Sequence, residues 1–166
     1  MCIRDSIRRL LIRAAQQKTI PIVNYNDPVS DEENRKMELA IRRSHGDQVV
    51  ECVDNDETAA VIANLVHAKK LVLMTSTEGI YRDPADPKTL VEQVTAKSME
   101  ELEEKVRQLQ ESCVGASRAG ANGAKAKLEY ALKSARQGTM VIIGHARHRL
   151  SDLVEGRVAC TRIGLE

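Results

Sequence analysis

The sequence contains neither Phe nor Trp, and its three Tyr leave aromatic residues at 2% of the 166 positions. Val, Ile, Leu, Ala and Met must therefore build the hydrophobic core. The stacking platforms that bind single-stranded nucleic acid are nearly absent. A large charge of either sign is also missing, because 25 Lys and Arg balance 24 Asp and Glu. With no overall field to attract nucleic acid or an anionic membrane, we expect neither as a partner.

Long apolar runs and cysteine motifs are missing as well. No stretch approaches the ~20 apolar residues that a membrane span needs, and no cleavable leader opens the chain, which predicts a cytoplasmic protein. Cys2, Cys52, Cys113 and Cys160 are far apart and form no C-x-x-C pair, so we expect reduced, mostly buried thiols. The His residues show no metal-motif spacing, and we predict no metal site built from these side chains.

What the sequence does contain is an alternation of short β-rich runs and longer helical stretches, which is typical of a parallel sheet covered by helices. It predicts an α/β fold with about five strands. Expected strands lie at 20–23, 48–53, 71–74, 140–143 and 157–163, and expected helices at 3–17, 30–43, 58–67, 98–109, 124–137 and 151–155. The helix at 58–67 is apolar on nearly all sides, which predicts burial between layers. Gly138 is expected to end the helix at 124–137.

Polar residues directly follow the expected strands, at 24–27, 54–56, 75–78 and from Gly144 onward. In open parallel sheets, ligands bind beyond the carboxyl ends of the strands. Asn and Asp are also common in turns and helix caps, so each cluster alone has this simpler explanation. The cluster at 54–56 is the most informative, because one acid suffices for a cap. The second acid and the amide are then free to bind a ligand group, Mg²⁺ or a lysine that contacts phosphate.

A glycine-rich segment at 115–123 runs into the expected helix that carries Lys125 and Lys127. Glycines allow the backbone to approach an anion closely, while N–H groups and a lysine at a helix start balance phosphate charge. The segment does not match the Walker pattern of P-loops. A flexible loop followed by ordinary surface lysines has the same composition, so both interpretations stay open.

Five short segments follow one another in a specific order: residues 22–27, 53–56, 73–84, 120–128 and 153–163. The first reads I-V-N-Y-N-D, the second V-D-N-D, and the third contains T-S-T-E-G-I-Y-R-D-P. In this order they resemble the motifs of the amino acid kinase family, and within it those of the glutamate 5-kinases most closely. The likeness runs from about Pro21 to the C-terminus. It implies the carbamate kinase-like fold, a three-layer αβα sandwich with a mainly parallel sheet.

The resemblance implies phosphoryl transfer from ATP, with Mg²⁺, to the side-chain carboxylate of L-glutamate, the first step of proline biosynthesis. By the family motifs, Asn24, Asp27 and Asn55 would contact the amino acid, Asp54 and Asp56 would arrange the reacting groups, and Lys127 would stabilise the transferred group. The implied ATP-binding residues are Thr75, Ser76, Gly79, Tyr81, Gly120, Ala121, Asn122, Gly123, Ala124, Lys125, Ala126 and Lys127.

The sequence also departs from the family pattern. Ser76 stands where the family has an acid, Asn122 where it has a glycine, and Ala121 and Ala126 where it has hydroxyl residues. Nothing before Pro21 corresponds to the family's opening strand, its glycine-rich turn with a lysine, or its serine-bearing segment. We therefore expect a partial kinase domain at 20–166 that lacks its N-terminal half and is inactive alone. A homo-oligomer or a separate N-terminal half would be its partner. Before it lies a segment, 1–19, whose first six residues look like a foreign or mistranslated start.

Two other functions stay open. One is a kinase of the same superfamily that acts on uridylate or isopentenyl phosphate. Asn24 and Asp27 argue against it, because the resemblance places them around an α-amino acid. The other is a noncatalytic nucleotide-binding module, which the substitutions in the phosphate segment favour.

Overall fold

The computed structural model describes residues 3–23, 55–83, 85–112 and 123–166. The chain forms two compact units, residues 1–58 and 59–166. The expected strand at 48–53 and the expected helix at 30–43 lie outside the described residues. In the part of the chain that the structure describes, no helix is long and apolar enough to cross a membrane. The predicted boundary after residue 19 stays a prediction.

In the first unit, the expected N-terminal helix is confirmed as α1 (Ile3–Gln16). The predicted buried strand at 20–23 is wrong, because these residues form no strand, and Ile20 and Ile22 are 90% and 94% exposed. An apolar run becomes a strand only where another strand pairs with it. Pro21 also removes one of the N–H donors that such pairing uses.

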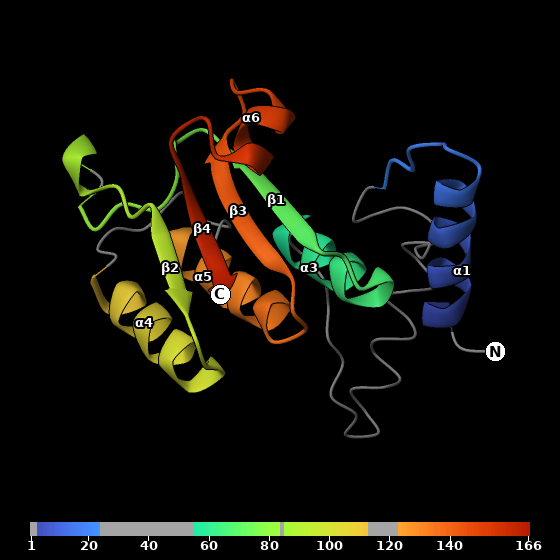
Figure 1. Cartoon of the computed structure of the whole chain (residues 1–166), viewed down its shortest axis with the longest axis horizontal. Coiled ribbons are helices and arrows are strands. Elements are labelled where there is room, and N and C mark those ends of the chain that lie inside the picture. The colour runs from blue at the N-terminus through green and yellow to red at the C-terminus, as the bar shows by residue number, and fades with distance from the viewer. Residues whose placement is uncertain (1–2, 24–54, 84, 113–122) are drawn as a thin grey trace, which may run out of the picture. The chain divides into compact units, whose positions relative to one another are not determined.

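The second unit contains a four-stranded sheet with the order β1 (Lys70–Thr75), β3 (Met140–His145), β4 (Cys160–Leu165) and β2 (Gln93–Ala96). β1 is parallel to β3 and β2 is parallel to β4, whereas β3 and β4 are antiparallel. Figure 1 shows β3 and β4 inside the sheet and β1 and β2 at its edges. Three expected strands are thus confirmed. The sequence does not predict β2, whose four residues include only one large apolar side chain.

One face of the sheet packs against α4 (Met99–Ser112) and α5 (Gly123–Ala135), as Figure 1 shows. The core between them contains Val141 and Ile143 of β3, which alternate along the strand, and Leu128 of α5. All three side chains are fully buried. This layer of the molecule is therefore an ordinary α/β core built without Phe or Trp.

The opposite face of the sheet packs against the short helix α6 (Leu150–Glu155). Ile142, which lies between the two core residues of β3, contacts Leu153 of α6 and Cys160 there. Cys160 is a buried free thiol, as expected, while the other cysteines lie outside the described residues. Helices on both faces confirm the expected layered α/β architecture.

Helix α3 (Asn55–Val66) begins in the first unit and continues into the second. Only Ala60 and Ala63 are buried in it, and its other apolar side chains are half-buried. The prediction that this helix is buried between layers is therefore wrong. A sequence pattern shows which sides of a helix are apolar, but it does not show how many of those sides a neighbour covers.

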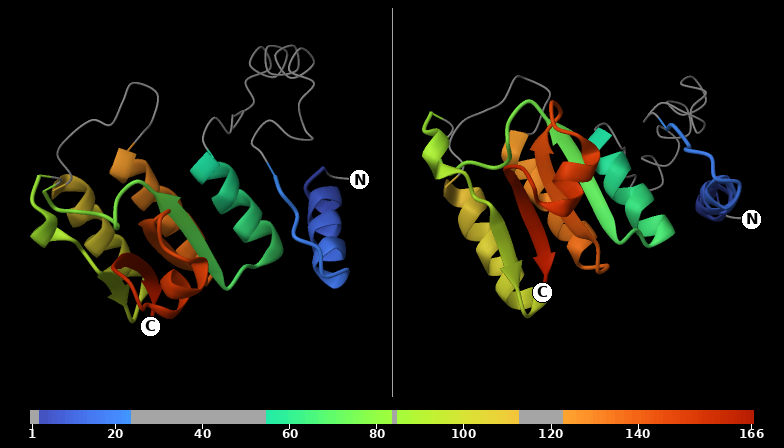
Figure 2. Two further views of the ribbon diagram at one scale, coloured as in Figure 1. Left: turned by 90° about the horizontal axis from the view of Figure 1, so that it is seen from above. Right: turned by 45° about the horizontal axis from the view of Figure 1, so that its top comes forward.

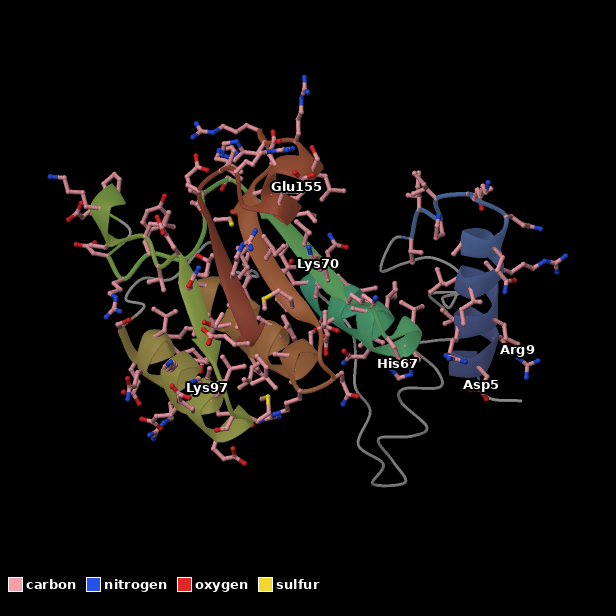
Figure 3. The ribbon with its side chains drawn as sticks, viewed as in Figure 1. Asp5, Arg9, His67, Lys70, Lys97 and Glu155 are labelled. Carbon is pink, nitrogen blue, oxygen red and sulfur yellow. The ribbon has the colours of Figure 1, made fainter. Side chains whose placement is uncertain are left out.

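Two similar connections lead from a helix into the parallel strands β1 and β3. The residue after α3 is His67, with a φ of 51°, and the turn that follows α5 ends at Gly138, with a φ of 79°. In both connections, the N–H after the left-handed residue donates to the carbonyl five residues earlier, at 2.9 Å after His67 and 3.2 Å after Gly138. Gly138 is therefore confirmed as a helix end, and His67, labelled in Figure 3, adopts the same conformation without being a glycine.

Candidate functional site

The carboxyl ends of β1 and β3 lie together with the amino end of β4, where the strands of the sheet end. This strand-end edge of the sheet is distinct from its two outer strands, β1 and β2. Thr75 pairs with His145 in the parallel register, and Gly144 pairs with Cys160 in the antiparallel one. Just beyond the strands, the N–H of Ala146 donates to the carbonyl of Thr75 at 2.8 Å. Ligands of open α/β sheets bind at such an edge, so the segments that follow β1 and β3 are the first candidates for a site.

The segment after β1 begins with a turn built from threonine hydroxyls. Thr75 Oγ1 accepts the N–H of Thr77 at 2.9 Å, and Thr77 Oγ1 donates to the carbonyl of Gly79 at 3.0 Å. Thr and Ser hydroxyls stabilise turns in this way. Ser76 lies exposed within the turn. Thr75 therefore shapes the turn, and Ser76 is the more exposed side chain of this predicted nucleotide-binding pair.

Gly79 packs tightly against β4. A Cβ atom at Gly79 would lie 2.3 Å from Thr161 Oγ1 and 2.9 Å from the Thr161 backbone nitrogen. The same Thr161 Oγ1 accepts the N–H of Ile80 at 2.8 Å in the buried interior. Tyr81 then pairs with Leu90 in an isolated β-bridge. Close packing alone thus requires a glycine here, and Thr161 is a residue of the site that the sequence did not reveal.

Glu78 joins the segment after β1 to the segment after β3. His148 Nε2 lies 2.6 Å from Glu78 Oε2, and the guanidinium of Arg147 contacts Oε1 of the same carboxylate. Burial raises the pKa of Glu78, but the hydrogen bond with His148 and the charges of Arg147, His148 and His145 outweigh it, so the pKa lies below its usual value. The sequence signal for this cluster was the run H-A-R-H-R after a strand.

The N-terminus of α5 lies at this same edge of the sheet. Residues 136–139 are the whole connection between α5 and β3, so the helix runs back along the sheet before the strand begins. Both views in Figure 2 show α5 beginning near the end of β1. Gly123 starts the helix with a φ of 60°, which glycine adopts without strain. Lys125 is exposed and Lys127 is half-buried in the first turns, where a helix favours phosphate.

Two of the three alanines of this predicted phosphate-binding segment, Ala124 and Ala126, face the interior of the protein, and the third, Ala121, lies outside the described residues. Ala126 packs with Ala60 and Tyr130, and Ala124 packs against the main core. Their side chains are therefore used for packing between helices and sheet. Only the backbone at these positions is available to a phosphate group.

Asn55 and Asp56 occupy the first turn of α3, with Asn55 exposed and Asp56 half-buried. Acids in a first helical turn are stabilised by the helix dipole, which accounts for Asp56 without a ligand. Within the described ranges, no group of three or more His, Cys, Asp or Glu side chains is placed to hold a metal ion. The other predicted site residues lie outside the described residues: Asn24, Asp27, Asp54, Gly120, Ala121 and Asn122.

Among known proteins, glutamate 5-kinases are similar to this chain in sequence. The chain is 33% identical to the glutamate 5-kinase of Geobacillus kaustophilus and 32% identical to that of Gloeobacter violaceus, each over 149 residues. These alignments cover 88% and 89% of the chain but 34% and 35% of the relatives. The chain therefore spans about a third of the length of the curated relatives it matches.

A solved structure supports the fold. The carbamate kinase from Giardia lamblia bound to AMP-PNP matches with a TM-score of 0.51 and 19% identity, over 68% of this chain and 32% of that chain. The carbamate kinase-like fold is thereby confirmed. Residues 2–145 of the chain match the family model of the amino acid kinase family. This match begins upstream of Pro21, where we expected the likeness to begin. The chain belongs to the amino acid kinase family.

Proposed function

We propose that this chain provides the nucleotide-binding part of an enzyme that transfers the γ-phosphoryl group of ATP to the side-chain carboxylate of L-glutamate. One observation carries the proposal: a chain with glutamate 5-kinase relatives brings two predicted nucleotide segments, after β1 and at the start of α5, to one sheet edge. The products would be γ-glutamyl phosphate and ADP. The enzyme would act in the cytoplasm, in proline biosynthesis.

In this reaction, a carboxylate oxygen of glutamate forms a bond to the γ-phosphorus while the bond between that phosphorus and ADP breaks. The protein mainly holds the reactants in line and neutralises the phosphate oxygens. The N-terminus of α5 and Lys127 would neutralise those oxygens, and Ser76 would contact the nucleotide from the turn after β1. Mg²⁺ bound with ATP would supply further positive charge at the phosphates.

The amino-acid side of the site is proposed from the family motifs. Asn24, Asp27 and Asn55 would bind the amino and carboxylate groups of glutamate. Asp54 and Asp56 would arrange the reacting groups around them. Asn55 and Asp56 begin α3, where side chains can reach a ligand without distorting the helix.

The nucleotide role is tested by measuring ATP affinity with isothermal titration calorimetry. We expect Lys127→Ala to weaken ATP binding about tenfold, the effect of losing about 1.4 kcal/mol of interaction with phosphate. Lys133→Ala is the matched control, because Lys133 lies on the same helix and pairs with Glu129 at 2.7 Å in solvent. Its expected effect is less than about twofold. Equal effects of the two substitutions would contradict the role of Lys127.

A noncatalytic nucleotide-binding module is the second candidate, and the departures at Ala121, Asn122 and Ala126 favour it. Hydroxamate formation from ATP, glutamate and hydroxylamine separates the two functions. Acyl phosphate formation by this chain, or by this chain with a supplied N-terminal half, supports the kinase. ATP binding without any phosphoryl transfer in either case supports the module. UMP and isopentenyl phosphate as acceptors test the remaining superfamily alternative.

A further inference from the structure

Glu78 is the centre of a contact between segments that are far apart in the sequence. Its carboxylate receives the Arg147 guanidinium on one oxygen and lies 2.6 Å from His148 Nε2 on the other. The side chains of Glu78 and His148 are only 17% and 20% exposed. The contact between Glu78 and His148 is therefore screened little by solvent, whereas Arg147 is 64% exposed and its pair with Glu78 is screened more. The contact therefore contributes to the position of the segment after β1.

Two backbone donors fix this segment on either side of Glu78. The N–H of Ala146 donates to the Thr75 carbonyl at 2.8 Å, and the N–H of Ile80 donates to Thr161 Oγ1 at 2.8 Å. The first bond links the segment to β3 and the second links it to β4. Between these two bonds, Glu78 supplies the side-chain contact that holds the middle of the segment, next to the turn that carries Ser76.

The charges around Glu78 are all positive or able to become positive. Arg147, His148 and His145 act on its carboxylate, and each of them comes from the segment at the end of β3. The N–H of Arg147 donates to His145 Nδ1 at 3.0 Å, which orders that segment in turn. A carboxylate without these partners would repel the phosphates of a nucleotide. With them, the cluster presents no excess negative charge at the edge.

We propose that Glu78, Arg147 and His148 form a clamp that holds residues 75–80 in the shape that receives the nucleotide. Glu78 is then a positioning residue that acts through Thr75 and Ser76. A binding segment that is already ordered loses less conformational entropy when its ligand arrives, so the clamp strengthens nucleotide binding. The inference rests on the proposed function for its ligand, but the clamp itself can be tested without that ligand.

The test compares Glu78→Gln, His148→Gln and the double variant by ATP calorimetry and by amide hydrogen exchange. We expect Glu78→Gln, which loses its charge toward both Arg147 and His148, to weaken ATP binding about fivefold to tenfold and to speed exchange of the Ala146 and Ile80 amides. His148→Gln leaves the Arg147 contact in place and should have a smaller effect of the same kind. The double variant should resemble Glu78→Gln, because the two substitutions share the contact between Glu78 and His148. Glu103→Gln is the matched control, because it breaks an exposed ion pair with Arg136 of 2.9 Å on the helical layer.

A second control separates positioning from general stability. Val106→Ala removes part of a fully buried side chain of α4 and should lower the unfolding midpoint without changing ATP affinity. If ATP affinity instead follows the unfolding midpoint across all variants, the positioning role is refuted.

The outcomes distinguish this inference from the proposed function. If the unsubstituted chain binds no ATP, the proposed function fails, and the exchange rates alone decide whether the clamp exists. Unchanged exchange at Ala146 and Ile80 in Glu78→Gln would refute the clamp. Faster exchange with unchanged ATP affinity would refute its role in nucleotide binding. Additive effects in the double variant would show that Glu78 and His148 act separately, which also overturns the proposal.

Discussion

The two connections α3–β1 and α5–β3 have the same backbone geometry but different residues at the left-handed position. The helices that precede them also differ in how many side chains they bury. Both end their helix with a left-handed residue, His67 in one and Gly138 in the other. They are also bonded to each other, because the Thr139 hydroxyl donates to the Ala68 carbonyl at 2.7 Å. The contrast shows that a helix end can be fixed by its tertiary partner as well as by glycine.

Burial differs more than geometry between the two helices. α5 buries side chains along most of its length, whereas α3 buries only Ala60 and Ala63 among its residues. Most of the packing free energy of this helical layer therefore comes from α5 and α4. Truncation of a side chain in α5 should therefore destabilise the protein more than truncation of one in α3.

The largest loss of stability is expected from truncation of a core side chain. Leu128 of α5 is fully buried, so Leu128→Ala should lower the free energy of unfolding by about 2–5 kcal/mol. Ile62 of α3 is half-buried, so Ile62→Ala should cost about 1–2 kcal/mol. Urea unfolding followed by circular dichroism measures both values. Equal losses would mean that α3 contributes as much packing as α5.

Substitution of the two left-handed residues tests whether the two connections carry the same backbone strain. No atom lies within 4 Å of a Cβ added at Gly138, so Gly138→Ala should lose about 1 kcal/mol through backbone strain alone. His67→Gly should gain a similar amount, about 1 kcal/mol, because it relieves the same strain. The measurement is again the free energy of unfolding in urea. A loss of stability in His67→Gly would show that the imidazole makes a contact worth more than the strain.

The smallest expected effect concerns the carboxyl ends of β1 and β3, where Glu78 links the segments that follow these strands. Because its pKa is lowered in the folded state, Glu78 stabilises the protein fully above its usual carboxyl pKa. That contribution is lost as the pH falls through the lowered value. The difference in unfolding free energy between the unsubstituted chain and Glu78→Gln should therefore be larger at pH 7 than at pH 3. A difference that does not change with pH would contradict the pairing of Glu78 with Arg147 and His148.

The sequence predicted those parts of the fold that depend on local pattern. β1 and β3 follow from apolar runs, and the end of α5 follows from Gly138. The run at 20–23 has the same apolar character and yet is exposed, because strand formation depends on a pairing partner that the pattern does not specify. β2 escaped prediction because its two core side chains, Val94 and Ala96, are too few to mark a strand.

The candidate site was predictable only where it follows strand ends or family motifs. Thr75, Ser76 and Lys127 belong to such segments, and all three lie in segments at the end of the sheet where β1 and β3 have their carboxyl ends. Glu78 and Thr161 lie in segments that the sequence singled out, but their contacts were not predicted, because each acts on a partner about 70 to 80 residues away in sequence. Such pairs become visible only when the strands are placed next to each other.

The tight fit of Gly79 against β4 changes how this glycine should be interpreted in related sequences. A methyl group there would meet not only the hydroxyl of Thr161 but also its backbone nitrogen, at 2.9 Å. No exchange of the Thr161 side chain can relieve that second collision. A homologue that no longer binds nucleotides would still need a glycine at this position, because the same packing excludes a side chain. A glycine at this position in homologues would therefore indicate the packing of the segment after β1 against β4, and not the retention of an enzyme.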